Sequence, residues 1–300
     1  MEAIVFDRFG GPEVLRVAEV GVPQPGPGQV RLRVVAAGVN PVDHKVRNGL
    51  LEQVFPTVFP ATPGWEAAGV VDEVGEGVTG LAAGDEVLGF TDTGAYADYA
   101  LATVVARKPA GLGWDEAAAL PVAGETAQRV LDLLAVGAGE TVLIHGAAGG
   151  VGGVAVQLAV ARGATVVGTA SPGNHDYLRS LGAVPVAYGP GLADRVRAVA
   201  PRVDAVFDAA GQGAVEVSVE LRGGVDRIVT IADAVAAQQS GVVFSAGGER
   251  SGEALAALAE LAGTGRLRVE VAGTFALADA GKAQDRSAGG HVRGKLLLRP

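Results

Sequence analysis

The feature that most constrains this chain is a glycine-rich turn between a buried strand and an apolar helix. The stretch Val142–Ala161, VLIHGAAGGVGGVAVQLAVA, contains no Asp, Glu, Lys or Arg. A run of about 20 apolar residues is also long enough to span a membrane. The glycines are clustered, however, and His145 and Gln157 interrupt the apolar run. We therefore predict a strand, a tight turn and a helix.

The glycines have a spacing that suits a diphosphate. Gly146, Gly149 and Gly152 follow the pattern G-x-x-G-x-x-G, and Ala148 holds the place of the middle glycine in the usual dinucleotide fingerprint. Small residues let backbone N–H groups approach a pyrophosphate, and the start of a helix carries partial positive charge. A glycine turn that serves packing alone is the alternative. The predicted cofactor contacts in this turn are Gly146, Ala147, Gly149, Gly150, Val151 and Gly152.

The segment after the second strand bears on which dinucleotide binds. NAD sites usually carry Asp or Glu about 20 residues past the turn. This chain has no acidic residue from Thr141 to His175. A 2′-phosphate would meet no carboxylate there, and Ser171, Asn174 and Tyr188 offer hydrogen-bond donors. We predict NADP(H), with the alternative that Ser171 and Asn174 are only turn and cap residues.

Strand and helix patterns alternate over residues 119–250, which indicates a doubly wound parallel α/β sheet of the Rossmann type. Residues 1–118 show short strands with dense Pro and Gly, typical of a β unit. We expect residues 251–300 to return to this N-terminal part. The segment 67–78 is predicted as a strand followed by a turn and a glycine-punctuated loop. The other predicted strands are 30–39, 140–146, 164–171, 184–188, 203–211, 225–233, 241–248 and 294–300, and the predicted helices are 152–163, 174–182 and 253–265.

Charge and composition narrow the functional class. The net charge of −9 argues against nucleic acid as a partner, because phosphate binding needs clustered Lys and Arg. The absence of cysteine excludes disulfides and thiolate metal sites. The first residues, MEAIVFDRFGG, do not have the pattern of a signal peptide. We expect a cytoplasmic protein without a membrane partner.

Several segments together resemble the zinc-free quinone oxidoreductase branch of the medium-chain dehydrogenase/reductase superfamily. The resemblance implies a GroES-like β-barrel domain made by both chain ends, a central Rossmann domain and a homodimer joined through the Rossmann sheets. It also implies hydride transfer from NADPH to quinones, enones or enoyl substrates. The matching segments are AAGVNPVDHKVRNG (36–49), TPGWEAAGVVDEVGEGVTGLAAGDEVLG (62–89), GAYADYA (94–100), LPVAGETA (120–127), VLIHGAAGGVG (142–152), LRSLGA (178–183) and GGHVRGKLLL (289–298).

Two sequence positions separate this chain from the zinc-dependent relatives. Where these relatives have a cysteine ligand this chain has Asn40, and their Gly-His-Glu is Gly64-Trp65-Glu66 here. We therefore expect no metal, and reduction of a quinone or an activated C=C bond rather than alcohol oxidation. A departure within the branch is Pro172-Gly173, where relatives often carry Lys or Arg. It weakens the argument for a 2′-phosphate, although His175 or Arg179 could compensate.

The resemblance places Asn40, Asp43 and Thr126 near the nicotinamide. Asn40 could donate a hydrogen bond to a substrate carbonyl oxygen, and Asp43 could orient Asn40 or a water. Thr126 would contact the nicotinamide ribose or carboxamide. The alternative for the first pair is helix capping, because Asn40-Pro41-Val42-Asp43 is also a good helix start. The two roles can coexist.

The sequence thus predicts an NADPH-dependent reductase of quinones or α,β-unsaturated carbonyls. A reductase of one biosynthetic intermediate and a non-catalytic NADPH-binding redox sensor are the alternatives. The apolar segment 47–60 hints at a hydrophobic substrate.

Overall fold

The computed structural model describes all 300 residues, which divide into two compact units. The first unit contains Met1–Val122 and Arg250–Pro300, and the second contains Ala123–Glu249. Helix α2 (Trp114–Leu133) contributes residues to both. The domain boundaries expected after residues 118 and 250 stay a prediction, because compactness does not show which segments fold by themselves.

The second unit is built on a six-stranded, fully parallel sheet. Its strand order is β10-β9-β8-β11-β12-β13, which is 3-2-1-4-5-6 in order of appearance. This is the order of a dinucleotide-binding Rossmann sheet, so the predicted fold class is confirmed for this unit. The strands are β8 (Thr141–His145), β9 (Thr165–Ala170), β10 (Val184–Ala187), β11 (Ala205–Asp208), β12 (Ile228–Thr230) and β13 (Val243–Phe244).

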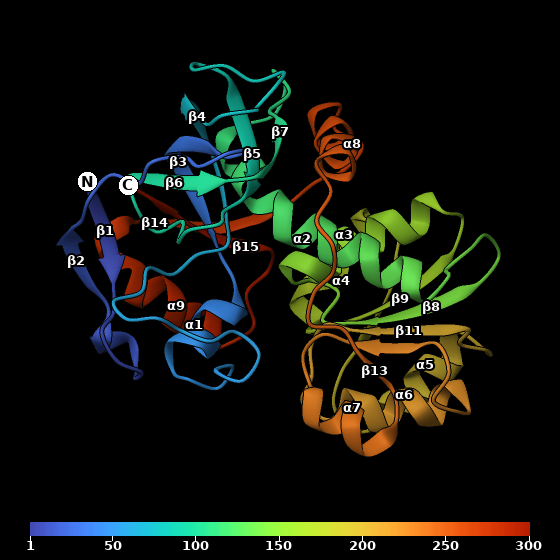
Figure 1. Cartoon of the computed structure of the whole chain (residues 1–300). Helices are drawn as coiled ribbons and strands as arrows, with labels where there is room; N and C mark the ends of the chain where they lie inside the picture. Colours follow the sequence, from blue (N-terminus) through green and yellow to red (C-terminus); the bar gives the residue numbers. More distant parts are fainter. The chain divides into compact units, whose positions relative to one another are not determined.

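Helices cover both faces of this sheet. The chain steps from β8 through β9 to β10 in one direction along the sheet and from β10 through β11 and β12 to β13 in the other. Because parallel crossovers are right-handed, the connections that run in opposite directions lie on opposite faces. Figure 1 shows α3 and α4 on one side of the strands and α5, α6 and α7 on the other. The direction changes between β8 and β11, the place where such sheets bind ligands. The helices are α3 (Gly150–Ala161), η2 (Pro172–Asn174), α4 (His175–Ser180), α5 (Leu192–Val199), α6 (Ala214–Arg222) and α7 (Ala234–Ser240).

The apolar stretch Val142–Ala161 is a central strand followed by a helix. β8 lies between β9 and β11, and its apolar residues are buried, as in strands covered on both faces. Leu143 packs in one core with Val167 and Val206 from the neighbouring strands. α3 has 12 residues. No helix of the chain is long and apolar enough to cross a membrane.

The first unit contains a larger, mainly antiparallel sheet of the order β14-β15-β3-β4-β5-β7, with β6 also paired to β3. Alternation along β3 buries Val30, Leu32 and Val34 and leaves Arg33 exposed, as the two-residue period of a strand requires. β15 pairs antiparallel with β3, so the C-terminal strand completes the N-terminal sheet. The strands are β3 (Val30–Val39), β4 (Glu66–Val74), β5 (Glu86–Phe90), β6 (Tyr99–Ala102), β7 (Val104–Arg107), β14 (Val271–Ala276) and β15 (Lys295–Arg299).

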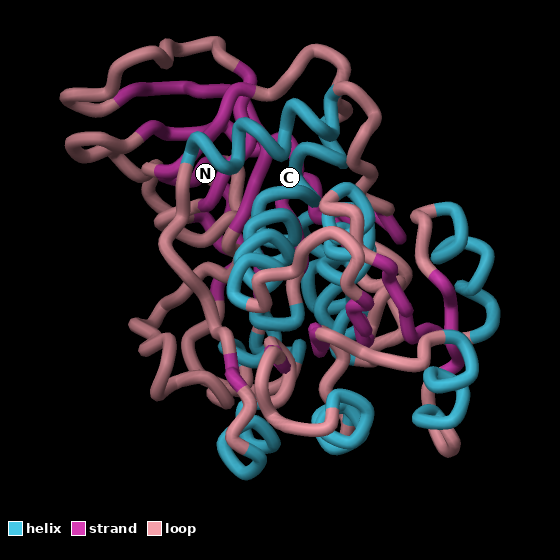
Figure 2. Tube along the Cα trace, turned by 90° about the vertical axis from the view of Figure 1, so that its right-hand side faces the viewer, coloured by secondary structure: helices cyan, strands magenta, loops and turns pink.

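Shorter elements complete the first unit, which holds both chain ends (Figure 2). β1 and β2 form a two-stranded antiparallel sheet. Helix α9 packs against α1 and β15. The core between them contains Tyr96, Leu277 and Leu296. The bounds are β1 (Glu2–Val5), η1 (Pro12–Val14), β2 (Arg16–Glu19), α1 (Pro41–Arg47), α8 (Gly252–Gly263), η3 (Leu277–Asp279) and α9 (Ala280–Ala288).

The structure corrects two sequence expectations. Residues 1–118 are not only strands and turns, because α1 lies within them and α2 begins at Trp114. The first turn of α2, Trp-Asp-Glu-Ala-Ala-Ala, has acidic residues where the helix dipole favours them, followed by alanine, the strongest helix former. The strand expected over 241–248 is limited to Val243–Phe244.

Candidate active site

The glycine turn of the second unit begins directly after β8. Gly146 has φ +68°, a left-handed conformation that favours glycine. The N–H of Gly149 donates to the Gly146 carbonyl at 2.9 Å and closes the turn. A Cβ on Gly152 would lie 2.2 Å from the Gly146 oxygen. Only glycine at position 152 therefore lets α3 approach the turn this closely.

Not every amide of the turn remains for a ligand. The N–H of Ala147 donates to the Thr169 carbonyl at 3.1 Å, and that of Gly149 closes the turn. The N–H of Gly153 donates to the Gly149 carbonyl at 2.8 Å, as α3 begins. The preceding amides, those of Gly150, Val151 and Gly152, are the first of the helix and have no acceptor within it. These three donors and the helix dipole fit a diphosphate.

Ser171 and Asn174 lie together after the end of β9. Asn174 Nδ2 donates to Ser171 Oγ at 3.2 Å. Neither side chain makes a helix-capping hydrogen bond, so both keep polar atoms that capping does not use. Arg179 forms an exposed ion pair with Asp176 at 2.6 Å.

Tyr188 follows β10 on a loop that a single arginine holds in place. The Tyr188 side chain is half-exposed. The guanidinium of Arg195 is committed to this loop and stabilises its conformation. It donates to the carbonyls of Ala187 (2.9 Å), Tyr188 (3.2 Å), Gly189 (3.1 Å) and Pro190 (2.8 Å).

The carboxyl ends of the central strands carry buried polar residues that are internally satisfied. The Asp208 carboxylate accepts from the N–H groups of Ala210 and Gly211, both at 2.9 Å, and from Thr230 Oγ1 at 2.7 Å. His145 Nε2 lies 3.1 Å from Ser218 Oγ. Burial lowers the pKa of His145 to about 4, and the imidazole is therefore neutral near pH 7. The hydrogen bonds of these residues are thus made within the sheet end itself.

Thr126 lies on α2 and is 8% exposed. Its hydroxyl donates to Glu125 Oε2 at 3.3 Å. The hydroxyl oxygen still has acceptor capacity.

In the first unit, Asn40 and Asp43 come together at the start of α1. Pro41 is the first helical residue, and Asp43 Oδ2 accepts from the Asn40 backbone N–H at 2.8 Å. Asp43 thus caps the backbone of Asn40. The Asn40 side chain turns instead to Glu66 and Lys295, neither of which was predicted as a site residue.

Asn40, Glu66 and Lys295 form a buried polar cluster in which no side chain is more than 5% exposed. Asn40 Nδ2 donates to Glu66 Oε1 at 2.8 Å. Lys295 Nζ donates to Asn40 Oδ1 at 2.5 Å and to Glu66 Oε1 at 2.6 Å. The second carboxylate oxygen, Glu66 Oε2, accepts from the Val122 N–H at 2.7 Å. An acid at the start of the apolar strand β4 and a lysine at the start of Lys-Leu-Leu-Leu were the sequence signals for this buried pair.

Asp43 carries a strongly perturbed carboxyl group. It is 2% exposed, and its Oδ1 atom has no hydrogen-bond partner. Burial raises its pKa to about 7, although hydrogen bonds from Asn40 and Tyr96 and the positive charge of Lys295 act in the opposite direction. The carboxyl therefore exchanges a proton near neutral pH.

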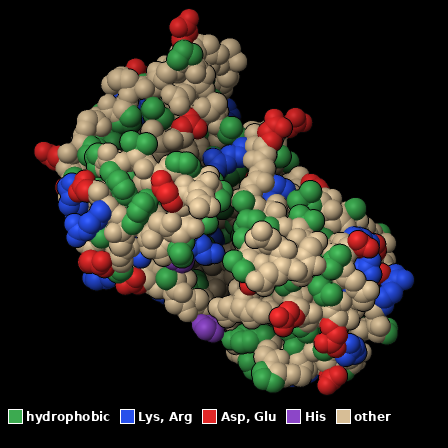
Figure 3. All heavy atoms as spheres, turned by 60° about the horizontal axis from the view of Figure 1, so that its bottom comes forward, with side chains coloured by type: hydrophobic (Ala, Val, Ile, Leu, Met, Phe, Trp, Pro, Cys, Tyr) green, Lys and Arg blue, Asp and Glu red, His purple; other side chains and the backbone are tan.

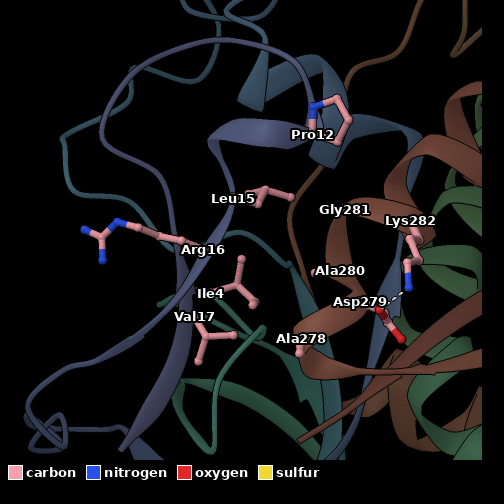
Figure 4. A pocket seen from close by; sticks show the side chains of 10 residues that line it. All are labelled: Ile4, Pro12, Leu15, Arg16, Val17, Ala278, Asp279, Ala280, Gly281 and Lys282. Carbon is pink, nitrogen blue, oxygen red and sulfur yellow. Dashed lines mark ion pairs between the residues drawn. The ribbon is translucent and has the colours of Figure 1, made fainter.

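The rest of the surface offers weaker candidates for a ligand-binding site than these residues. A hollow of about 230 Å³ in the first unit is lined in part by Ile4, Leu15 and Val17, while Arg16 points away from it (Figure 4). Its Lys282 is paired with Asp279 at 2.7 Å, so no free charge marks a ligand. On the face seen in Figure 3, acidic and basic side chains are interspersed. No group of three or more His, Asp or Glu side chains is placed to hold a metal ion.

Segments that include parts of both units match models of known protein families. Residues 26–130 match the model of the alcohol dehydrogenase GroES-like domain, and residues 181–298 match that of the zinc-binding dehydrogenases. The GroES-like β domain expected from the sequence is thereby confirmed. A GroES-like unit combined with a Rossmann unit defines a medium-chain dehydrogenase/reductase.

Individual relatives show to which branch of this superfamily the chain is most similar. The quinone oxidoreductase from Coxiella burnetii is 34% identical, and the two structures superpose with a TM-score of 0.86 over 100% of this chain and 99% of the other. A mycobacterial protein solved in complex with NADPH is 29% identical, with a TM-score of 0.87 and 100% coverage of both chains. The 2-methylene-furan-3-one reductase of Solanum lycopersicum is 36% identical over 83% of this chain. The chain belongs to the quinone oxidoreductase branch of the medium-chain dehydrogenase/reductase superfamily.

The chain covers only part of its curated relatives. It spans 66% of the tomato reductase and 53% of the human quinone oxidoreductase.

Proposed function

We propose that the chain is a reductase that binds NADPH and passes its hydride to a quinone or to an α,β-unsaturated carbonyl compound. The observation that carries this proposal is the glycine turn, where the amides of Gly150, Val151 and Gly152 begin α3 beside β8. Relatives named quinone oxidoreductase and 2-methylene-furan-3-one reductase support the two substrate classes.

The choice of NADPH over NADH rests on the surroundings of β9. No carboxylate follows this strand before Asp176, and Ser171 and Asn174 offer hydroxyl and amide groups there. Tyr188, on the loop held by Arg195, supplies a further hydroxyl. The relative solved with NADPH is in keeping with this choice.

Asn40 is proposed to stabilise the charge that develops on the substrate. When bound, NADPH supplies a hydride, which leaves negative charge on the carbonyl oxygen of an enone or quinone. Asn40 Nδ2 donates a hydrogen bond to that oxygen, and such a donor is most effective where water is excluded. Asp43 holds the Asn40 backbone, Thr126 contacts the nicotinamide ribose or carboxamide, and water supplies the proton that completes the product.

The substrate is proposed to be apolar. The segment after α1 exposes Leu50 (74%), Val54 (53%) and Val58 (84%), which would suit a hydrophobic compound. A homodimer through the second units is also proposed, because edge strand β13 leaves Val243 and Phe244 exposed.

The test is oxidation of NADPH by the purified chain in the presence of 1,4-benzoquinone or but-3-en-2-one, with protein-free mixtures as blanks. Saturable oxidation with either acceptor supports the proposal. Activity confined to one biosynthetic intermediate in a wider panel would identify a dedicated reductase. NADPH binding without turnover on any acceptor would contradict a catalytic role and leave a redox sensor.

A further inference from the structure

We infer that Lys295 and Glu66 are positioning residues that fix the polarity of the Asn40 amide, so that an N–H and not the carbonyl oxygen faces the substrate. This inference rests on the proposed role of Asn40 as a hydrogen-bond donor. It adds two residues whose effect on the reaction passes through Asn40.

The three groups of this cluster differ in whether they can donate or accept hydrogen bonds. A lysine ammonium only donates hydrogen bonds, and an ionised carboxylate only accepts them. An asparagine amide can do either, because a rotation of 180° exchanges its oxygen and nitrogen. With Lys295 Nζ at 2.5 Å on one side and Glu66 Oε1 at 2.8 Å on the other, only one orientation satisfies both neighbours.

In that orientation the Asn40 amide has a second N–H group besides the one that Glu66 accepts. Asn40 Nδ2 carries two N–H groups, and Glu66 accepts one of them. The other N–H is the group proposed to meet the substrate oxygen. If the amide were rotated, its oxygen would face both the Glu66 carboxylate and a negative substrate oxygen, which is repulsive in a buried setting.

Glu66 is itself rigidly held. It is fully buried, and its Oε2 atom accepts from the Val122 N–H at 2.7 Å. Val122 follows Pro121, a proline inside α2, which disturbs the helical hydrogen bonding at this point. A Cβ on Gly38 would lie 2.2 Å from Glu66 Oε1, so this glycine on β3 leaves the space that the carboxylate fills.

The first experiment measures kcat, KM and the dissociation constant for NADPH in Asn40→Ala, Lys295→Met and the double variant. We expect Lys295→Met to lower kcat about tenfold or more, because a misoriented donor is lost in the transition state. NADPH binding should stay within about twofold of wild type. The double variant should be no slower than Asn40→Ala alone, because Lys295 acts through Asn40.

A second variant separates a loss of kcat from a loss of folding stability. Lys295→Met alone leaves the Glu66 carboxylate buried without its partner charge, which can destabilise the fold. Lys295→Met with Glu66→Gln removes both charges, and the glutamine can present either oxygen or nitrogen to Asn40. This double variant should unfold near the wild-type temperature and still lose kcat. Lys295→Arg, which also only donates, should retain more of kcat than Lys295→Met.

The outcomes separate the two proposals. If Asn40→Ala leaves kcat unchanged, the proposed role of Asn40 fails, and this inference fails with it. If Asn40→Ala is slow but the Lys295 and Glu66 variants keep wild-type kcat, the inference alone is overturned. Additive losses in Asn40→Ala combined with Lys295→Met would equally overturn it, because they show that Lys295 acts independently of the amide.

Discussion

The phenol of Tyr96 donates a hydrogen bond to Asp43 Oδ2 at 2.7 Å, and neither side chain is more than 2% exposed. The same carboxylate oxygen accepts from the Asn40 backbone N–H. Tyr96, in the segment GAYADYA, therefore holds the helix start that carries Asn40.

Tyr96→Phe should destabilise the first unit by about 1–3 kcal/mol, because it removes one donor from a buried acceptor. It should also raise the pKa of Asp43 further, since the Tyr96 hydrogen bond acts to lower it. Urea unfolding of wild type and variant at pH 8 measures the loss. Tyr99→Phe is the control, because this half-buried ring lies under Arg31 and away from Asp43. An equal loss of unfolding free energy in both variants would contradict a stabilising role of the hydrogen bond from Tyr96 to Asp43.

Asp43 should make the free energy of unfolding fall as pH rises from about 4 to about 7. Its pKa is raised to about 7 in the folded chain, so the folded state binds the proton that the unfolded state releases at about pH 4. Stability from this group is thus largest at low pH and levels off above about pH 7. In Asp43→Asn this slope should be absent. An identical pH profile in wild type and Asp43→Asn would contradict the raised pKa.

His145 should have the opposite effect to Asp43 on the free energy of unfolding, which should fall as the pH is lowered. Its pKa is lowered to about 4 by burial, so the unfolded chain takes up a proton at about pH 6.5 that the folded chain refuses. Stability should therefore fall as pH drops from about 6.5 to about 4, by an amount on the order of 3 kcal/mol. His145→Gln should remove this part of the acid sensitivity. Denaturant unfolding at several pH values measures both profiles, and a slope that persists in His145→Gln would assign it to other groups.

Ser171→Asp should shift the nucleotide preference from NADPH toward NADH. A carboxylate at the end of β9 repels a 2′-phosphate and can accept from the ribose hydroxyls of NADH. We expect a loss of about tenfold or more in NADPH affinity. The control is Thr165→Asp, an exposed position at the opposite end of the same strand. Similar NADPH titrations for all three proteins would contradict the assignment of the phosphate to Ser171.

The sequence predicts well those elements whose signal is local. β8 and α3 follow from an apolar run without charged residues and from clustered glycines, and their bounds agree with the prediction within two residues. α5, α6 and α7 were not predicted, because they have only eight, nine and seven residues, which leaves little room for a helical apolar period. In α6 the sequence Val-Glu-Val-Ser-Val also alternates as a strand does. Lys295 and Glu66 were missed for a different reason. They are 229 residues apart, and only the pairing of β3 with both β15 and β4 brings them together at Asn40.

The most direct test of this account is a fluorescence titration of the purified chain with NADPH, compared between wild type and Gly152→Ala. A methyl group at position 152 would collide with the Gly146 carbonyl 2.2 Å away and displace the amides that open α3. Gly224→Ala is the control, because a Cβ there meets nothing within 4 Å and the position lies outside the proposed binding residues. We expect saturable binding by wild type and by Gly224→Ala, with affinity lost in a folded Gly152→Ala. A wild-type chain that gives no saturable signal with either NADPH or NADH would contradict it.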